Sequence, residues 1–308
     1  MSDSSFKPTR IVVVGAGAVG STTAYTLLLR GQASEIVLVD VNRERAHGDA
    51  LDMSQGLPFI SRTRVWAGDY SDCKDADIII VSAGVGQKSG ETRQDLLRRN
   101  VRVIEQIVEN ITKYTTDAIL LIATNPVDVL SYYAFKQSGW KASRVIGSGT
   151  LLDSARLRYL TGRHLQVDPR SVHAHIVGEH GDTELAIWSR TNIAGVPVEL
   201  SDEDKQAIFH DVKDSAYQII QAKGATYYAI ALALDRICAA ILRDESAVLN
   251  VSTLVDDYHG ISDVYIGLPC IIDHEGIREI IDLKPTPEEL AGLKHSASEL
   301  RKRIDSVM

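Results

Sequence analysis

The most constraining feature of the chain is a short apolar run that ends in a cluster of glycines. Residues 11–14 are all β-branched, which is typical of a strand buried on both faces of a parallel sheet. A G-x-G-x-x-G pattern follows at residues 15–20, and helix-forming residues continue to Leu29. A glycine-rich turn between a strand and a helix lets backbone N–H groups approach a phosphate. The sequence therefore predicts an α/β fold that begins with an anion-binding turn.

An acidic residue at the end of the next predicted strand indicates which ligand this turn binds. Residues 35–39 form a second run of strand character, and Asp40 follows it, 20 residues after Gly20. In dinucleotide-binding turns an acid at this distance binds the ribose hydroxyls and repels the 2'-phosphate of NADP, so we predict NAD. A tight turn without a ligand is the alternative. The candidate NAD-binding residues of this region are Gly15, Gly17, Ala18, Val19, Gly20 and Asp40.

Two further apolar runs extend the predicted sheet. Residues 78–81 and 119–122 alternate with helix-forming stretches, which is the pattern of a doubly wound parallel sheet. Ligands of such sheets lie at the carboxyl ends of the strands. Gly84 follows the first run and Asn125 follows the second, so both are candidates for the edge that binds NAD.

A second constellation of polar residues lies in the other half of the chain. His180 stands between Gly178 and Gly181, which have no side chains to shield its ring from a ligand. Upstream, Asp153 and Arg156 are three positions apart in a helix-like segment, so they share one helix face. A carboxylate can orient an imidazole and favour its protonated form, and a guanidinium suits a substrate carboxylate. We expect these three side chains to converge on a small acidic molecule.

Length and composition limit the class of protein. A chain of 308 residues exceeds the usual size of a single core, so we expect two domains, one at 1–147 that binds NAD and one at 148–308 that binds the substrate. Hydrophobic residues make up 44% and charged residues 24%, as in an ordinary globular protein. The formal charge of -8 and the lack of long Lys/Arg runs argue against nucleic-acid binding.

The cysteines and the amino terminus indicate no metal, disulfide or membrane segment. Cys73, Cys238 and Cys270 are far apart, so we expect buried thiols rather than a zinc site or a disulfide framework. The start of the chain is polar, and residues 11–14 are too few for a signal peptide or a membrane span. We expect a cytoplasmic protein that holds no metal ion.

Four motifs, in their order and spacing, resemble the L-lactate and malate dehydrogenase family over essentially the whole chain, and its bacterial L-lactate dehydrogenases most closely. The motifs are Gly15-Ala16-Gly17-Ala18-Val19-Gly20, Gln87-Lys88-Ser89-Gly90-Glu91-Thr92-Arg93, Asp153-Ser154-Ala155-Arg156 and Gly178-Glu179-His180-Gly181-Asp182. The resemblance implies a Rossmann domain followed by an α+β substrate domain, with reversible hydride transfer between NADH and pyruvate to form L-lactate.

The resemblance also implies a role for each polar residue. His180 would donate its proton to the carbonyl oxygen of pyruvate, and Asp153 would orient the ring and raise its pKa. Arg156 would bind the substrate carboxylate through two parallel hydrogen bonds; a surface salt bridge to Asp153 is the alternative. Arg93, in a predicted mobile loop, would close over the substrate and polarise its carbonyl. Asn125 would bind the substrate oxygen or His180, and the bond to Pro126 is expected to be cis.

Substrate choice is expected to depend on Gln87, which matches the position where malate dehydrogenases typically carry an arginine. A neutral side chain there leaves the second carboxylate of oxaloacetate unpaired, and Glu91 adds a further unfavourable charge. Thr226 matches the residue that lines the methyl pocket of lactate dehydrogenases; a helix residue packed on the sheet is the alternative. Pyruvate is the first prediction, branched-chain 2-oxo acids the second and oxaloacetate the third.

Arg158 and His173 match positions that bind fructose 1,6-bisphosphate in allosteric members of the family. Because two subunits supply that site, the resemblance implies a homo-oligomer, usually a tetramer. A surface cation and an ordinary strand residue are the alternatives. A non-enzymatic NADH-sensing Rossmann protein would explain the glycines, but not the match of His180, Asp153 and Arg93 to a hydride-transfer site.

A serine hydrolase is not favoured, because no G-x-S-x-G turn follows a strand. For the second half of the chain, the residue pattern predicts strands near 172–177, a long helical stretch at about 202–242 and a terminal helix from Pro287.

Overall fold

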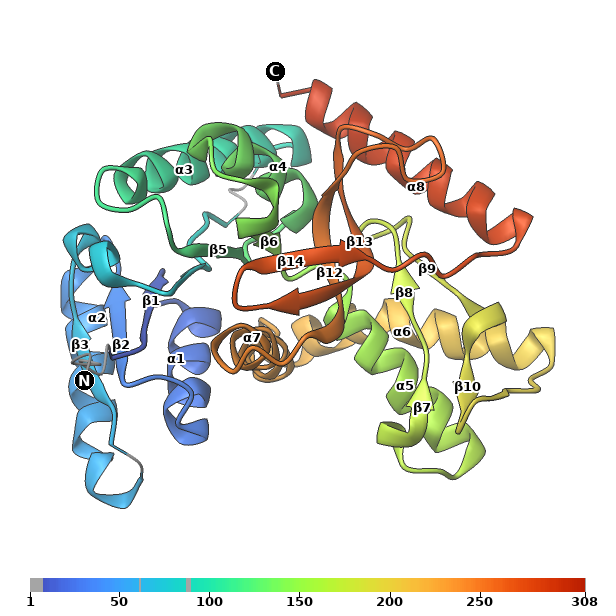
Figure 1. The fold of residues 1–308 in the computed structure, drawn as a ribbon, viewed down its shortest axis with the longest axis horizontal. Helices are drawn as coiled ribbons and strands as arrows, with labels where there is room; N and C mark the ends of the chain where they lie inside the picture. The colour runs from blue at the N-terminus through green and yellow to red at the C-terminus, as the bar shows by residue number, and fades with distance from the viewer. Residues whose placement is uncertain (1–7, 61, 87–89, 308) are drawn as a thin grey trace, which may run out of the picture.

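The computed structural model describes residues 8–60, 62–86 and 90–307. Its largest element is a nine-stranded sheet in the order β14-β13-β12-β6-β5-β4-β1-β2-β3 (Figure 1). In the described part of the chain, no helix combines the length and the apolar character needed to cross a membrane.

One side of this sheet is a parallel, doubly wound unit. Its strand order reverses between β1 and β4, so the loops after these strands diverge and leave a crevice for a ligand. The parallel strands are β1 (Arg10–Val14), β2 (Glu35–Val39), β3 (Arg64–Ala67), β4 (Ile78–Val81), β5 (Ile119–Ile122) and β6 (Val145–Gly147). The helices between them are α1 (Ala18–Arg30), α2 (Arg43–Gln55), α3 (Arg93–Thr112) and α4 (Val127–Ser138).

Antiparallel strands extend the sheet beyond β6. Ser252 of β12 pairs with Gly147 of β6, which joins the two parts through one continuous sheet. This part contains β12 (Ala247–Val255), β13 (Val264–Asp273) and β14 (Gly276–Ile280). The predicted fold class, a Rossmann sheet followed by a mixed α and β part, is confirmed.

The remaining helices and short strands belong to the carboxyl-terminal half. The helices are α5 (Leu151–Leu165), α6 (Asp202–Lys223), α7 (Tyr228–Leu242) and α8 (Pro287–Asp305), and the short strands are β7 (Val172–His173), β8 (Ile176–Val177), β9 (Leu185–Ala186), β10 (Asn192–Ile193) and β11 (Val196–Pro197). Short 3-10 turns occur at η1 (Leu57–Phe59), η2 (Tyr70–Asp75), η3 (Ala142–Arg144), η4 (Pro169–Ser171) and η5 (Trp188–Arg190).

One prediction about this half needs correction. The stretch predicted as one long helix is two helices, because Gly224 adopts a left-handed conformation with φ 87° and ends α6. The strands predicted near 172–177 are confirmed as β7 and β8. The terminal helix begins at Pro287 as predicted, and a capping box formed by Thr286 and Glu289 stabilises its start.

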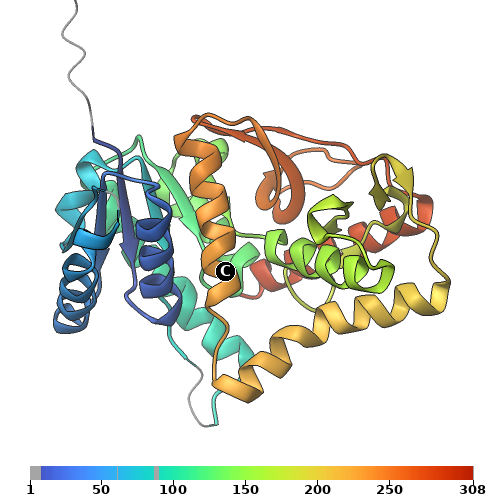
Figure 2. The ribbon, with the colours of Figure 1, turned by 90° about the horizontal axis from the view of Figure 1, so that it is seen from below.

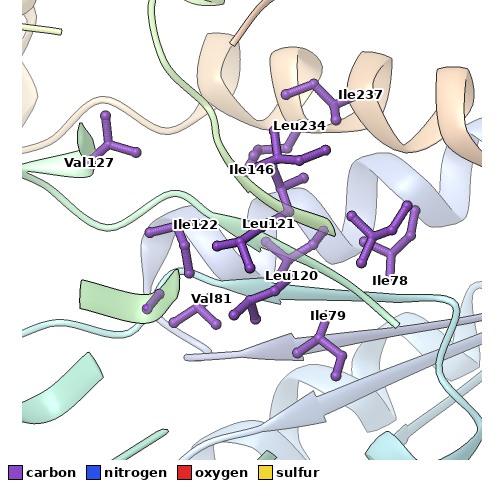
Figure 3. Close-up of a cluster of buried hydrophobic side chains, with 14 of the residues drawn as sticks. Ile78, Ile79, Val81, Leu120, Leu121, Ile122, Val127, Ile146, Leu234 and Ile237 are labelled. Atoms are coloured by element: carbon purple, nitrogen blue, oxygen red, sulfur yellow. The ribbon is translucent and has the colours of Figure 1, made fainter. Parts of the chain in front are cut away.

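The core joins both halves of the chain. Figure 3 shows Leu120 and Leu121 of β5 beside Ile78 of β4, with Leu234 and Ile237 of α7 above them. Figure 2 shows α7 between α1 and the rest of the carboxyl-terminal half. Each fully buried aliphatic side chain stabilises the fold by about 2 kcal/mol. The three cysteines are buried free thiols, as predicted: Cys73, Cys238 and Cys270.

Candidate active site

The glycine turn has the shape that the sequence predicts. Gly15 has φ 105°, and a Cβ there would lie 2.5 Å from the backbone nitrogen of Ala83. At Gly20 a Cβ would lie only 1.8 Å from the carbonyl oxygen of Gly15, so neither position tolerates a side chain. A Cβ at Gly17, the residue before α1, would meet no described atom within 4 Å. The turn is therefore tight on its inner side and open at the start of α1, which fits the pyrophosphate of NAD.

Asp40 lies directly against this turn. Its carboxylate accepts a hydrogen bond from the backbone N–H of Ala16 at 2.6 Å and another from that of Asn42 at 2.8 Å. These bonds place a negative charge beside the glycine turn, at the end of β2. This is the arrangement in which a carboxylate meets the adenosine ribose of NAD.

His180 and Asp153 form the central pair of the second constellation. His180 follows β8 and Asp153 lies in the first turn of α5, and the ring Nδ1 is 2.5 Å from the Asp153 carboxylate. The negative charge of Asp153 raises the pKa of His180 from 6.5 to about 9, although burial opposes the shift. Burial alone would raise the pKa of Asp153, but the charges and hydrogen bonds of His180 and Arg156 lower it. The pair therefore favours an imidazolium beside a carboxylate.

Arg156 belongs to the same cluster, as its position on the helix face predicts. Its Nη1 donates to the other Asp153 oxygen at 2.8 Å. This contact is an ion pair, but not one at the surface, because the side chains of Arg156 and Asp153 are only 14% and 3% exposed. One guanidinium nitrogen donates to Asp153, and the remaining N–H groups of Arg156 can donate to another carboxylate.

Asp128 is a part of the site that the sequence did not reveal. Its buried carboxylate accepts a hydrogen bond from the backbone N–H of His180 at 2.7 Å and one from the Ser252 hydroxyl at 2.6 Å. Burial raises the pKa of Asp128 to about 6, against the lowering effect of these bonds. The residue fixes the backbone at His180. Its only local signal is its place just after Asn125-Pro126, which does not indicate a contact 52 residues away along the chain.

A cavity of about 450 Å³ connects the glycine turn with the cluster around His180. It lies beside the glycine turn and the start of α5, where the parallel sheet changes direction. Six predicted site residues line it: Val19, Gly84, Asn125, Arg156, His180 and Thr226. Thr226 lies between α6 and α7 rather than within a helix. The Asn125-Pro126 bond is cis, as the resemblance implies.

Two predicted residues, Arg93 and Gln87, are not part of this arrangement as described, for different reasons. Arg93 does not lie in a loop: it is the exposed first residue of α3, and it is not part of the cavity lining. The helix starts there because Thr92 and Asp95 form a capping box. Gln87 lies outside the described residues.

Arg158 and His173 lie together at a separate cavity of about 590 Å³. Arg158 is on the same helix as Arg156 but points elsewhere, and its Nε donates to the carbonyl oxygen of Val172 at 2.8 Å. His173 is exposed in β7. The two candidate effector residues are thus neighbours on a surface different from that of His180.

A doubly wound sheet with a phosphate-binding turn, and a His–Asp pair in the cavity at its switch point, defines the class of NAD-binding Rossmann dehydrogenases. The family can be named from sequence comparison. Residues 9–147 match the model of the lactate/malate dehydrogenase NAD binding domain, and residues 150–308 match that of the lactate/malate dehydrogenase alpha/beta C-terminal domain. The chain belongs to the lactate/malate dehydrogenase family, and NAD is its cofactor.

Individual relatives cover nearly the whole chain. L-lactate dehydrogenase of Acetivibrio thermocellus is 49% identical, with 97% of each chain covered, and L-lactate dehydrogenase 2 of Bacillus cereus is 49% identical, with 97% of this chain and 98% of the relative covered. Among solved structures, the ligand-bound minor L-lactate dehydrogenase of Enterococcus mundtii superposes with a TM-score of 0.96 at 44% identity, covering 98% of this chain and 99% of that one. A lactate dehydrogenase from a deep-sea metagenome library of the Medee basin superposes with a TM-score of 0.95 at 45% identity, covering the same shares.

Proposed function

We propose that the protein is an L-lactate dehydrogenase that reduces pyruvate to L-lactate with NADH and catalyses the reverse reaction. The observation that carries this proposal is that His180 and Arg156, both bound to Asp153, line one cavity together with Val19 of the NAD-binding turn. The two relatives that are 49% identical are both L-lactate dehydrogenases, which supports the same substrate.

In the proposed mechanism, proton transfer falls to His180. Because Asp153 engages Nδ1, the nitrogen that can face a substrate is Nε2. With a pKa of about 9, His180 is protonated at neutral pH and can donate to the carbonyl oxygen of pyruvate. When bound, NADH supplies the hydride that reduces the carbonyl carbon. In lactate oxidation, neutral His180 takes the proton of the hydroxyl group, and Asp153 stabilises the imidazolium that results.

We propose that Arg156 binds the substrate carboxylate and that Asn125 binds the reacting oxygen. Both line the cavity with His180, so each can meet a different end of a small 2-oxo acid. Thr226 would border the methyl group, and Gln87 would set the preference for pyruvate over oxaloacetate. For Arg93 we propose a closing movement, since its side chain stands outside the cavity lining at the start of α3.

For the cofactor, we propose that Gly15, Gly17, Ala18, Val19 and Gly20 hold the pyrophosphate, that Asp40 holds the ribose, and that Gly84 and Asn125 border the nicotinamide end. We further propose domains at 1–147 and 148–308. The last parallel strand, β6, ends at Gly147, which supports a boundary at this point.

The cavity with Arg158 and His173 is the proposed site for fructose 1,6-bisphosphate, because two basic side chains there can bind a phosphate. Its lining also includes Leu232 and Val248, which are large apolar side chains exposed by 57% and 50%. Apolar surface of this kind favours cover by another protein surface. We therefore propose a homo-oligomer, with a tetramer as the expected form, in which a second copy completes the effector site.

The experiment that tests this function follows NADH oxidation with pyruvate, oxaloacetate and 2-oxoisocaproate, each with and without fructose 1,6-bisphosphate. We expect the highest kcat/KM for pyruvate and a lower KM in the presence of the bisphosphate. Higher kcat/KM for oxaloacetate or for the branched acid would overturn the substrate proposal. An unchanged KM would remove the effector proposal and leave the activity intact.

A further inference from the structure

Glu184 is a buried carboxyl group that the mechanism above does not use. It precedes β9 and is only 7% exposed. One of its oxygens, one oxygen of Asp153 and a ring nitrogen of His180 all lie within 4.8 Å of one another. Burying a second carboxyl group beside Asp153 is unfavourable unless a cation pairs with it or it keeps its proton.

The surrounding groups leave Glu184 without a dedicated partner. Both oxygens of Asp153 are engaged, one by His180 and one by Arg156. Lys213 of α6 is the next cation, but its Nζ donates to the carbonyl oxygen of Asp182 at 2.7 Å. Among residues 8–60, 62–86 and 90–307, no side chain forms a hydrogen bond or a salt bridge with the Glu184 carboxyl group.

The other charged groups nearby are also committed. Asp128 of α4, which also raises the pKa of His180, accepts from Ser252 and from the His180 backbone. A metal ion is a poor occupant of the cluster, because Asp153 is already satisfied and the cations Arg156 and Lys213 repel a further positive charge.

The charges of the cluster depend on one another. Burial and the charge of Asp153 raise the pKa of Glu184 to about 8, while His180, Lys213 and Arg156 oppose the rise. An ionised Glu184 in turn raises the pKa of His180. The protonation states of Glu184 and His180 are therefore coupled at neutral and mildly alkaline pH.

We propose that Glu184 is a positioning residue for proton transfer: it keeps its proton at neutral pH and, by ionising in alkaline solution beside the protonated ring, keeps His180 a proton donor over a wider pH range. Its own proton passes to solvent. This inference rests on the proposed pyruvate reductase activity and adds a residue that touches neither substrate nor cofactor.

The test compares Glu184→Gln with the parent enzyme over the pH range in kcat/KM for pyruvate. At pH 6 the side chain at position 184 is neutral in the parent enzyme and in the variant, so their kcat/KM values should agree within about twofold. A charge about 5 Å away shifts a pKa by at least about half a unit even in water, so the variant should be about threefold or more slower on the alkaline limb. Glu203→Gln, an exposed glutamate on α6, should leave the profile unchanged.

Two outcomes would overturn the role of Glu184. One is a Glu184→Gln profile in which kcat/KM falls at the same alkaline pH as in the parent enzyme. The other is a loss of activity by the same factor at every pH, as a merely structural residue would produce. Glu184→Asp, which retains the charge, should restore most of the alkaline activity.

Ring NMR of His180 provides a readout that does not depend on turnover. In the parent protein the His180 signals should titrate in two steps, one of them near pH 8 where Glu184 ionises, and the variant should show one step. A single step in the parent protein would refute the coupling even if Glu184→Gln failed to fold. An inactive parent enzyme with two-step titration would refute the proposed function and leave the coupling standing.

Discussion

Replacing Asp153 with asparagine changes the charge beside His180 while keeping nearly the same shape. The pKa of His180 is raised from 6.5 to about 9, chiefly by the charge of Asp153. At about 1.4 kcal/mol per pKa unit, the rise corresponds to roughly 3 kcal/mol of preference for the imidazolium. Without that charge, burial becomes the stronger influence, so the pKa of His180 should fall to its ordinary value or lower.

The kinetic effect of Asp153→Asn follows from the form of His180 that each direction uses. Pyruvate reduction needs the protonated ring, and at pH 7.5 a ring with a pKa of about 6.5 is only about one-tenth protonated. The kcat/KM for pyruvate should therefore fall at least about tenfold at that pH and recover in part as the pH is lowered toward 5.5. Lactate oxidation needs the neutral ring, so its pH profile should also move to lower pH.

The assay is the initial rate of NADH absorbance change across the pH range, in both directions. Asp202→Asn is the control, because Asp202 is an exposed aspartate whose ion pair with Lys205 lies on the surface of α6. Its profile should match that of the parent enzyme. If kcat/KM of Asp153→Asn for pyruvate fell at the same alkaline pH as that of the parent enzyme, the Asp153 carboxylate would not set the pKa of His180.

Three further predictions concern the turn, the carboxyl-terminal helix and the effector cavity. Gly20→Ala should lower the free energy of unfolding by about 2 kcal/mol, measured by denaturant unfolding, since its Cβ overlaps backbone. Gly17→Ala should leave the unfolding transition unchanged and weaken NADH binding in a fluorescence titration; equal stability of both variants would contradict the turn geometry. Arg303→Ala should lower the free energy of unfolding by about 2 kcal/mol because the buried Glu179 loses its cation and keeps only the hydrogen bonds from Thr183, and no change would refute this role of α8. Arg158→Gln should abolish the effect of fructose 1,6-bisphosphate on KM without changing basal kcat, and retained activation would exclude the proposed site.

The parts of the site that were predictable depend on local sequence patterns. Strand, glycine turn and helix follow one another directly along the chain, so the sequence alone is enough to place Gly15, Gly20 and Asp40. Asp153 and Arg156 could be paired because helix periodicity brings residues three apart onto one face, and the observed contact confirms it. Their meeting with His180 was inferred from the chemistry of the three side chains and from the resemblance, because helix periodicity says nothing about a residue 24 or more positions away.

The parts that were missed depend on burial and on contacts between distant segments. Asp128 and Glu184 look like ordinary acidic residues in the sequence, and only the packing of α4 and the segment before β9 reveals that both are buried near His180. The break at Gly224 was missed because apolar spacing continues on both sides of it. Arg93 was assigned to a loop from the glycine and lysine before it, although Thr92 and Asp95 carry a helix-start signal.

The fate of the hydride tests directly whether the protein reduces pyruvate with NADH through His180. The protein should be incubated with pyruvate and NADH that carries two deuterium atoms at C4, with His180→Asn as the control, and the product analysed by mass and by chiral chromatography. We expect L-lactate with one deuterium on C2 from the parent protein, and little or none from His180→Asn. Absence of deuterated lactate, or equal yields from the parent protein and the His180 variant, would contradict it.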